Sequence, residues 1–214
     1  MNNQDIFQLI VERLKSETFL NDFKFRKRDS SFIQQENGLR RSIELEHWIM
    51  DDALIVYPIY MVRFDVLHKW FEPYSFKSLQ DQRDNPSVAF SGNMLGLQDK
   101  FQITEVDLEH NYTILLASLV ECSGIVFSSY TSLRDMFNHD IIPIMEGKRT
   151  LPDVGANWAF KYLALTRIVS LENYSAVKEL VLTQVYKMAE RQEPNIIEYI
   201  PRLEEITNAI ESQF

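Results

Sequence analysis

Residues 32–49 read FIQQENGLRRSIELEHWI, and this stretch decides the fold. Its centre, Asn37-Gly38, is typical of a two-residue hairpin turn, because both residue types tolerate a positive φ. Such a turn pairs residue 36 with 39 and residue 32 with 43. Because side chains alternate along a strand, the return strand 39–49 carries its core residues on one face: Leu39, Ile43, Leu45, His47 and Ile49.

The sequence before the hairpin predicts a helix and a first strand. Apolar residues between Ile6 and Leu14 recur at spacings of three and four, which indicates an amphipathic helix packed on a sheet. Residues 23–28, FKFRKR, alternate apolar and basic side chains as a strand does. Uninterrupted pairing would place Phe25 on the opposite face from Phe32, so we expect a bulge near residues 29–31.

The sequence after the hairpin predicts further strands and then helices. Residues 53–64 form a strand, residues 66–71 a short helix, and residues 88–90 and 101–104 short strands, which together give a five-stranded meander. The polar segment 72–97 is the least regular and has the length of a functional loop. From residue 107 onward the hydrophobic period is helical; one helix over 158–169 is apolar all round, and the next carries a single stripe: Tyr174, Val177, Val181, Val185 and Met188.

These elements predict an α+β fold in which an N-terminal helix packs on an antiparallel meander sheet, followed by a C-terminal bundle of about four to five helices. We expect residues 1–105 to form the helix and sheet and residues 106–214 the helical half, joined in one compact structural unit.

Composition excludes several classes of protein. The 214 residues carry a formal net charge of −9, which argues against a general nucleic-acid partner. One cysteine, Cys122, leaves no internal disulfide. The apolar run 53–62 is shorter than the ~20 residues of a membrane span, and the N-terminus lacks the layout of a secretory signal. We therefore expect a cytoplasmic protein without a membrane partner.

A basic run is the first candidate binding surface. Lys24, Arg26 and Arg28 alternate along the first strand, and the hairpin places Arg40 and Arg41 on a neighbouring strand. These residues predict a docking surface for an acidic protein, a phosphorylated ligand or RNA. The alternative is a solvated face neutralised by the cross-strand carboxylates Glu44 and Glu46.

Aromatic residues near the long loop are the second candidate surface. Tyrosine and tryptophan are favoured at contact hot spots, so we consider a binding patch at Tyr57, Tyr60, Trp70 and Tyr74. The alternative is that these rings, with Phe71 and Phe76, fill the core.

Catalytic and metal chemistry find no coherent pattern. Glu44 and Glu46 share a strand face, but His47 points to the other, so strand alternation divides this potential ligand set. Tyr174-Ser-Ala-Val-Lys178 matches two short enzyme motifs without the glycine-rich context of either. We expect no catalytic residues, no metal and no cofactor.

Four segments together resemble a bacterial family known only as a domain of unknown function: FKFRKR (23–28), IELE (43–46), IVF (125–127) before SLRD (132–135), and WAFKY (158–162). The resemblance implies an N-terminal helix, a meander and C-terminal helices, with no catalytic residues. Some similar small proteins lie beside polymorphic toxins, so the resemblance also implies an immunity-like or other binding role.

The sequence therefore favours a noncatalytic protein-binding module that uses the sheet, the basic hairpin or the 72–97 loop. The competing hypothesis is a small-ligand-binding protein or an enzyme with a pocket between the sheet and the helices, lined by Glu44, Glu46, His47 or the aromatic residues.

Overall fold

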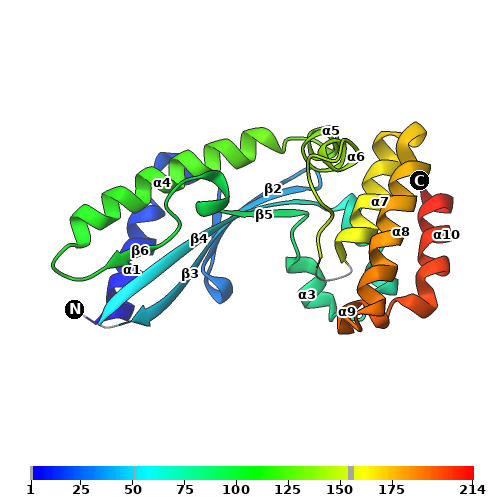
Figure 1. The fold of residues 1–214 in the computed structure, drawn as a ribbon. Helices are drawn as coiled ribbons and strands as arrows, with labels where there is room; N and C mark the ends of the chain where they lie inside the picture. Colours follow the sequence, from blue (N-terminus) through cyan, green and yellow to red (C-terminus); the bar gives the residue numbers. More distant parts are fainter. Residues whose placement is uncertain (1, 51, 154–156) are drawn as a thin grey trace. The chain divides into compact units, whose positions relative to one another are not determined.

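The computed structural model describes residues 2–50, 52–153 and 157–214, and its elements confirm the predicted α+β class (Figure 1). Its contacts divide the chain into two compact units: residues 1–63 with 88–129, here the first unit, and residues 64–87 with 130–214, here the second unit. This division does not follow the predicted boundary at residue 105, because the first long helix after that boundary packs with the sheet.

The first unit contains a six-stranded antiparallel sheet and two long helices. Its elements are α1 (Asn3–Leu14), η1 (Thr18–Leu20), β1 (Lys24–Arg26), η2 (Lys27–Asp29), β2 (Ser31–Glu36), β3 (Leu39–Met50), β4 (Ala53–Phe64), β5 (Val88–Ser91), η4 (Asn93–Leu95), β6 (Phe101–Ile103) and α4 (Leu108–Ser129).

The strand order β1-β2-β3-β4-β5 is a meander, and β6 also pairs with β4. The predicted five-stranded meander is therefore confirmed as β1–β5, and the predicted strand at 101–104 lies off its path, because the long β4 has room for two short partners on one edge. It pairs with β5 over residues 59–62 and with β6 over residues 54–56.

The hairpin has the predicted register. Residue 36 pairs with 39 and residue 32 with 43, and both turn residues, Asn37 and Gly38, have a positive φ. The expected bulge is a 3-10 turn, η2, followed by Ser30 in the left-handed region at φ 50°. This turn reverses the chain so that β1 pairs antiparallel with β2 and Phe25 lies beside Phe32.

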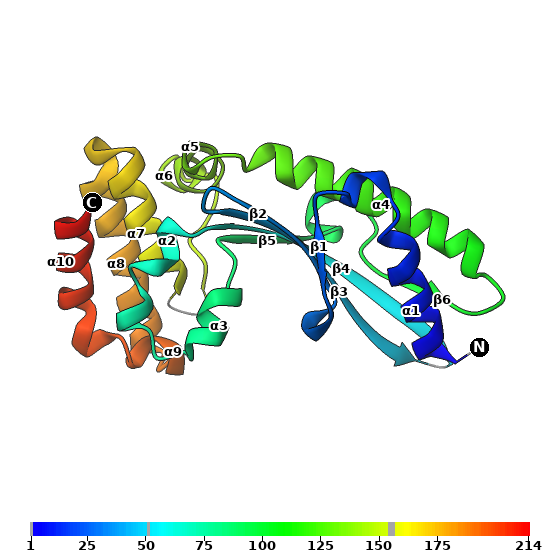
Figure 2. The ribbon, with the colours of Figure 1, turned by 180° about the vertical axis from the view of Figure 1, so that it is seen from behind.

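Helices α1 and α4 pack against each other and against the sheet (Figures 1 and 2). Arg13 of α1 donates two hydrogen bonds to Glu109 of α4, at 2.9 and 2.6 Å. Under α4, the hydroxyl of Tyr60 points at the Ser118 carbonyl oxygen, 3.5 Å away. The apolar residues of this core are fully buried: Ile6, Ile10, Leu14, Phe32, Ile43, Leu45, Leu115 and Leu119.

Among the described helices, only α4 is long and apolar enough to cross a membrane by length and composition. That criterion is weak evidence for one helix, since core helices also meet it. About one third of the apolar window of α4 is buried, and Leu115, Leu119 and Val126 are among its buried residues.

The second unit is helical. Its elements are α2 (Val66–Lys69), η3 (Glu72–Tyr74), α3 (Leu79–Asp84), α5 (Leu133–Met136), the π-helical turn η5 (Phe137–Ile141), α6 (Ile142–Met145), α7 (Asn157–Val169), η6 (Leu171–Asn173), α8 (Tyr174–Glu190), α9 (Pro194–Ile197), η7 (Ile200–Arg202) and α10 (Leu203–Gln213).

Helix α7 is the centre of the second unit and packs on α8 and α10. Its first nine residues after Asn157 are nearly all buried, as its all-round apolar sequence predicts. The α8 stripe is also confirmed: all five residues from Tyr174 to Met188 that were assigned to the core are buried. The C-terminal helices of the predicted fold thus lie in the second unit, whereas α4 belongs to the first.

Candidate functional site

The first unit contains a groove of about 830 Å³ between α1, η2 and the end of β3, hereafter the α1–β3 groove. Its lining combines aromatic, aliphatic and basic side chains: Phe7, Val11, Glu12, Lys15, Phe25, Lys27, Arg28, Ser30, His47, Trp48, Ile49 and Leu54, with Asn3, Gln4 and Gln8 at the N-terminal end of α1. A volume of this size accommodates several side chains or a small ligand.

The helical wall of the groove is fixed at both ends. A capping box starts α1, in which the Asn2 side chain accepts from the Asp5 amide and the Asp5 carboxylate accepts from the Asn2 amide. Farther along, the ring of Phe7 stacks on the imidazole of His47, with centroids 3.6 Å apart and ring planes at 15°. The stacking attaches α1 to the last part of β3.

The strand wall of the groove is a sheet edge. β2 pairs with β3 only as far as Ser31 and Glu44, and one more bond joins the Leu45 amide to the Ser30 carbonyl at 3.0 Å. Beyond that point η2 turns the chain away. Within residues 2–50, no strand pairs with residues 46–50 of β3 on the side of β2.

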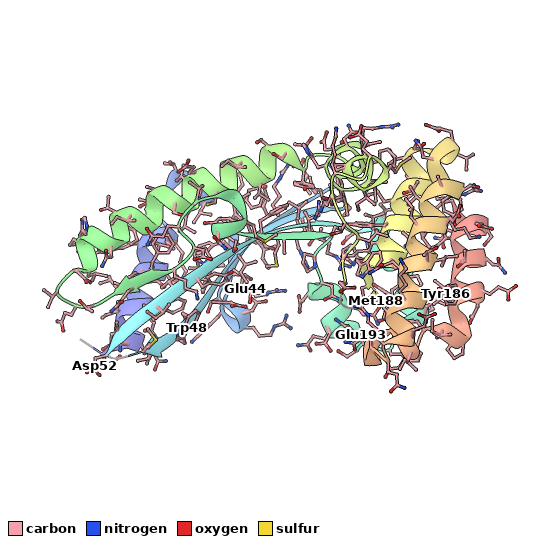
Figure 3. All side chains as sticks on the ribbon, in the orientation of Figure 1. Glu44, Trp48, Asp52, Tyr186, Met188 and Glu193 are labelled. Carbon is pink, nitrogen blue, oxygen red and sulfur yellow. The ribbon has the colours of Figure 1, made fainter. Side chains whose placement is uncertain are left out.

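Apolar side chains are exposed along this edge. Trp48, Ile49 and Met50 are 40%, 63% and 51% exposed. Figure 3 places Trp48 nearer the end of β3 than Glu44, with both residues on the same strand. The ring of Trp48 lies tilted beside that of Tyr57 on β4, with centroids 6.5 Å apart. An edge strand with three exposed apolar side chains is a site for association.

The charged residues of the groove are mainly basic. Three cations, Lys15, Lys27 and Arg28, and one carboxylate, Glu12, line it, whereas the whole chain carries a net charge of −9. Lys15 bonds to Glu12 at 2.6 Å and lies over the Phe25 ring, 5.0 Å from its centroid. The groove therefore presents positive charge beside apolar surface.

The turn that carries Lys27 and Arg28 is held by Asp29. Arg26 donates to both carboxylate oxygens of Asp29, and the Ser31 hydroxyl donates at 2.7 Å. Burial acts to raise the pKa of Asp29, but the hydrogen bonds from Arg26 and Ser31 and the charge of Arg28 outweigh it and hold that pKa below its usual value. Asp29 thus neutralises part of the basic run.

The predicted basic cluster is dispersed. Lys24 and Arg26 lie on β1, whereas Arg28 lies in η2 at the groove. Arg40 and Arg41 are near the opposite end of the hairpin, opposite Gln35 and Gln34, and Arg41 bonds to the Gln34 side chain at 3.2 Å. Of the five basic residues proposed from the sequence, only Arg28 lines the groove.

The predicted aromatic patch is divided between the two units. Tyr60 is 1% exposed in the first unit, and burial raises its pKa far above the usual value. Tyr57 is half-buried beside Trp48. Trp70 and Tyr74 belong to an aromatic core of the second unit, where Trp70 contacts Phe71 and Tyr74. Tyr60 and Trp70 therefore fill cores, as the alternative interpretation predicts.

The second unit has its own open groove, of about 810 Å³, between residues 144–153 and α8. Arg149, Asp153, Glu179, Gln184 and Lys187 are its charged or amide residues. Two of them already bond each other, since Gln184 donates to Asp153 at 2.9 Å. Two cations and two carboxylates line this groove, so its charge favours neither an acidic nor a basic ligand, unlike the mainly basic α1–β3 groove.

Metal chemistry has no support in the geometry. In the described ranges, no three histidine, cysteine, aspartate or glutamate side chains come close enough to hold a metal ion. His47 is occupied by Phe7 and by the Leu45 carbonyl oxygen, which lies 3.1 Å from its Nδ1. Among the predicted ligands, Glu46 is exposed on the strand.

Phe7, Lys15 and the exposure of Trp48 were not predicted from the sequence. His47 and Ile49 were assigned to the core by alternation, but both are exposed, because the buried part of β3 ends at Leu45. A usable signal was the unequal length of the hairpin strands, because residues 39–49 overhang residues 32–36 and leave one edge without a partner.

Comparison with known proteins identifies no relative of this chain. No family model matches the chain, no curated protein matches it, and no solved structure matches its fold.

Proposed function

We propose that the chain is a noncatalytic protein-binding module whose partner occupies the α1–β3 groove. The observation that carries the proposal is the free edge of β3, where Trp48, Ile49 and Met50 remain exposed beside a recess large enough for partner side chains. Association would remove this apolar surface from water and would cover an edge that otherwise favours aggregation.

The chemistry of the groove is that of a protein interface. Tryptophan and arginine are enriched among residues that dominate binding energy, and Trp48 and Arg28 both line the groove. Positive charge within an otherwise acidic chain favours an acidic partner, because complementary potentials accelerate encounter and disfavour wrong partners.

The nucleophilic side chains considered from the sequence support binding over catalysis. Cys122 is fully buried, and Tyr174 is buried on the α8 stripe with Lys178 bonded to Glu211 at 2.7 Å. Neither has access to a substrate. The cytoplasmic location and the immunity-like role expected from the sequence belong to this same proposal.

The test compares three baits in affinity capture from a lysate of the source organism, with bound proteins quantified by mass spectrometry. The baits are the wild type, Ile49→Lys at the groove, and Val106→Lys as a matched control. Val106 is 98% exposed and does not line the groove, so the same substitution changes charge and hydropathy elsewhere in the first unit.

We expect one partner to be retained by the wild type and Val106→Lys and to fall about ten-fold with Ile49→Lys. All three baits should melt within about 2 °C of one another, since both positions are exposed. A stoichiometric partner that Ile49→Lys retains equally, or no partner for a folded wild-type bait, contradicts the proposal.

A further inference from the structure

We propose that the partner contributes an extended segment that ends in acidic residues and adds to the free edge of β3 as a further antiparallel strand. This inference rests on the proposed function and specifies how the α1–β3 groove is occupied. It follows from the direction of the backbone groups of β3, from the course of β2 and η2, and from the position of the cations.

The backbone of β3 has bonding groups directed at the groove. The Leu45 amide donates to the Ser30 carbonyl on the β2 side of the strand. Because these groups alternate in direction along a strand, the amides and carbonyls of His47 and Ile49 point to the same side. On that side, neither amide has a hydrogen-bond partner among the described backbone groups.

No part of β2 lies next to these backbone groups, because the chain turns away from the edge of β3 at η2. β2 would continue alongside residues 46–50 of β3, but Ser30, at φ 50°, and η2 turn the chain out of the row. His47 Nδ1 lies against the Leu45 carbonyl oxygen and caps the last group before the row opens. His47 and Ile49 then offer two donors and two acceptors to a new strand.

The cations fix the direction of the added strand. Lys27 and Arg28 lie in η2, at the end of the row nearest Leu45. β3 runs away from that end, so an antiparallel strand runs toward it and finishes beside the two cations. Carboxylates at the C-terminal end of the partner segment would therefore meet Lys27 and Arg28, while apolar side chains on one face of the segment would contact Phe7 and Ile49.

A second copy of this chain is the alternative occupant of the edge. An antiparallel pair of β3 edges would place the η2 cations of the two copies at opposite ends of the shared row, so these cations would not face each other. Three cations against one carboxylate in the groove favour instead a separate segment that brings carboxylates of its own. A concentration-dependent dimer that Ile49→Lys dissociates, seen by size exclusion with light scattering, would overturn the assignment of the edge to an acidic partner.

The probe is a library of random peptides of about ten residues, long enough for one strand, selected by display on the wild-type chain. We expect the enriched peptides to alternate apolar and polar residues and to carry aspartate or glutamate toward the C-terminus. Peptides without these features, or no enrichment on the folded protein, overturn the inference.

Two readouts on one selected peptide are specific for strand addition. Saturation with the peptide should slow hydrogen exchange of the His47 and Ile49 amides about ten-fold or more, because both become ladder donors. Every second amide of an added strand points at β3. N-methylation of these amides should weaken binding about ten-fold, and N-methylation of the amides between them should have little effect.

Two matched variants test whether the acidic end of the peptide lies beside the η2 cations. Lys27→Glu should weaken the selected peptide about five-fold or more, and Lys24→Glu should leave it unchanged, because Lys24 belongs to the same basic run but does not line the groove. Equal effects of the two variants overturn the predicted direction of the strand.

The outcomes separate the two proposals. One outcome is that Ile49→Lys abolishes partner capture, but the peptide does not slow exchange of the His47 and Ile49 amides and both sets of N-methylated peptides bind equally. In that case the groove binds a partner, but strand addition is wrong. If Ile49→Lys changes neither capture nor peptide binding, the proposed function itself is wrong.

Discussion

The imidazole of His47 lies stacked on the ring of Phe7, with centroids 3.6 Å apart. His47 belongs to the part of β3 that extends beyond its pairing with β2, and Phe7 belongs to the buried face of α1. This contact is the point at which the two walls of the α1–β3 groove meet, so the shape of the groove depends on it.

Phe7→Ala should lower the free energy of unfolding by about 3 kcal/mol, because it removes a buried ring and leaves a cavity. Phe7→Leu keeps most of the apolar volume and should cost less than about 1.5 kcal/mol. Urea denaturation followed by circular dichroism measures both values. Equal stability of Phe7→Ala and the wild type would mean that the ring does not hold α1 to the sheet.

Ser30 adopts a left-handed conformation at φ 50° where the chain leaves the edge of β3. A glycine tolerates that conformation without strain, at the cost of greater freedom in the unfolded chain. We expect Ser30→Gly to raise the free energy of unfolding by about 0.5 kcal/mol, and Ser30→Val to lower it by about 1–2 kcal/mol. The reverse order in urea denaturation would contradict the geometry of this turn.

Tyr60 was a candidate binding residue and is a core residue in the structure. Tyr60→Phe removes only a hydroxyl whose bond to the Ser118 carbonyl oxygen is long, at 3.5 Å. It should change the free energy of unfolding by less than about 1 kcal/mol and leave partner capture unchanged. A selective loss of the partner with a stable Tyr60→Phe chain would return this residue to the binding surface.

The Asp140 carboxylate of the second unit predicts a pH effect on stability. Burial raises its pKa above the ordinary value of 3.8, against the opposing charge and hydrogen bond of Arg149 and a hydrogen bond from Tyr130. Its second oxygen, Oδ2, is buried without a hydrogen-bond partner among the described residues. The charged form is thus less favourable in the folded chain than in the unfolded chain.

A raised pKa means that the folded state binds more protons than the unfolded state between the ordinary and the raised value. The contribution of protonated Asp140 is fully present below 3.8 and is lost as the pH rises through the folded pKa. The stability of the wild type minus that of Asp140→Asn should therefore decrease as the pH rises above about 4. Chemical denaturation of both chains between about pH 4 and pH 7 measures this difference, and a difference that increases with pH would contradict it.

Periodic patterns predicted much of the fold from the sequence. The Asn37-Gly38 turn fixed the register of β2 and β3, because a two-residue turn leaves one pairing, and the α8 stripe predicted five buried residues. Local patterns did not predict that α4 joins the sheet, since its assignment depends on contacts with α1, such as Arg13 to Glu109.

The site was harder to predict because it depends on where packing stops. Alternation assigned His47 and Ile49 to the core face, but the buried part of β3 ends at Leu45. Charge counting identified a basic run, but Asp29 bonds Arg26, and only Lys27 and Arg28 reach the groove. The α1–β3 groove is therefore formed by a strand end and a turn, which are the features that sequence periodicity predicts least well.

The most direct test of the central claim is photo-crosslinking in the source organism. The chain would carry p-benzoylphenylalanine in place of Ile49 in one strain and in place of Val106 in a second, since both positions are exposed in the first unit. The account predicts a discrete crosslinked partner at position 49 that is absent at position 106. No crosslink at 49, or the same products at both positions, would contradict the claim that the free edge of β3 is the binding site.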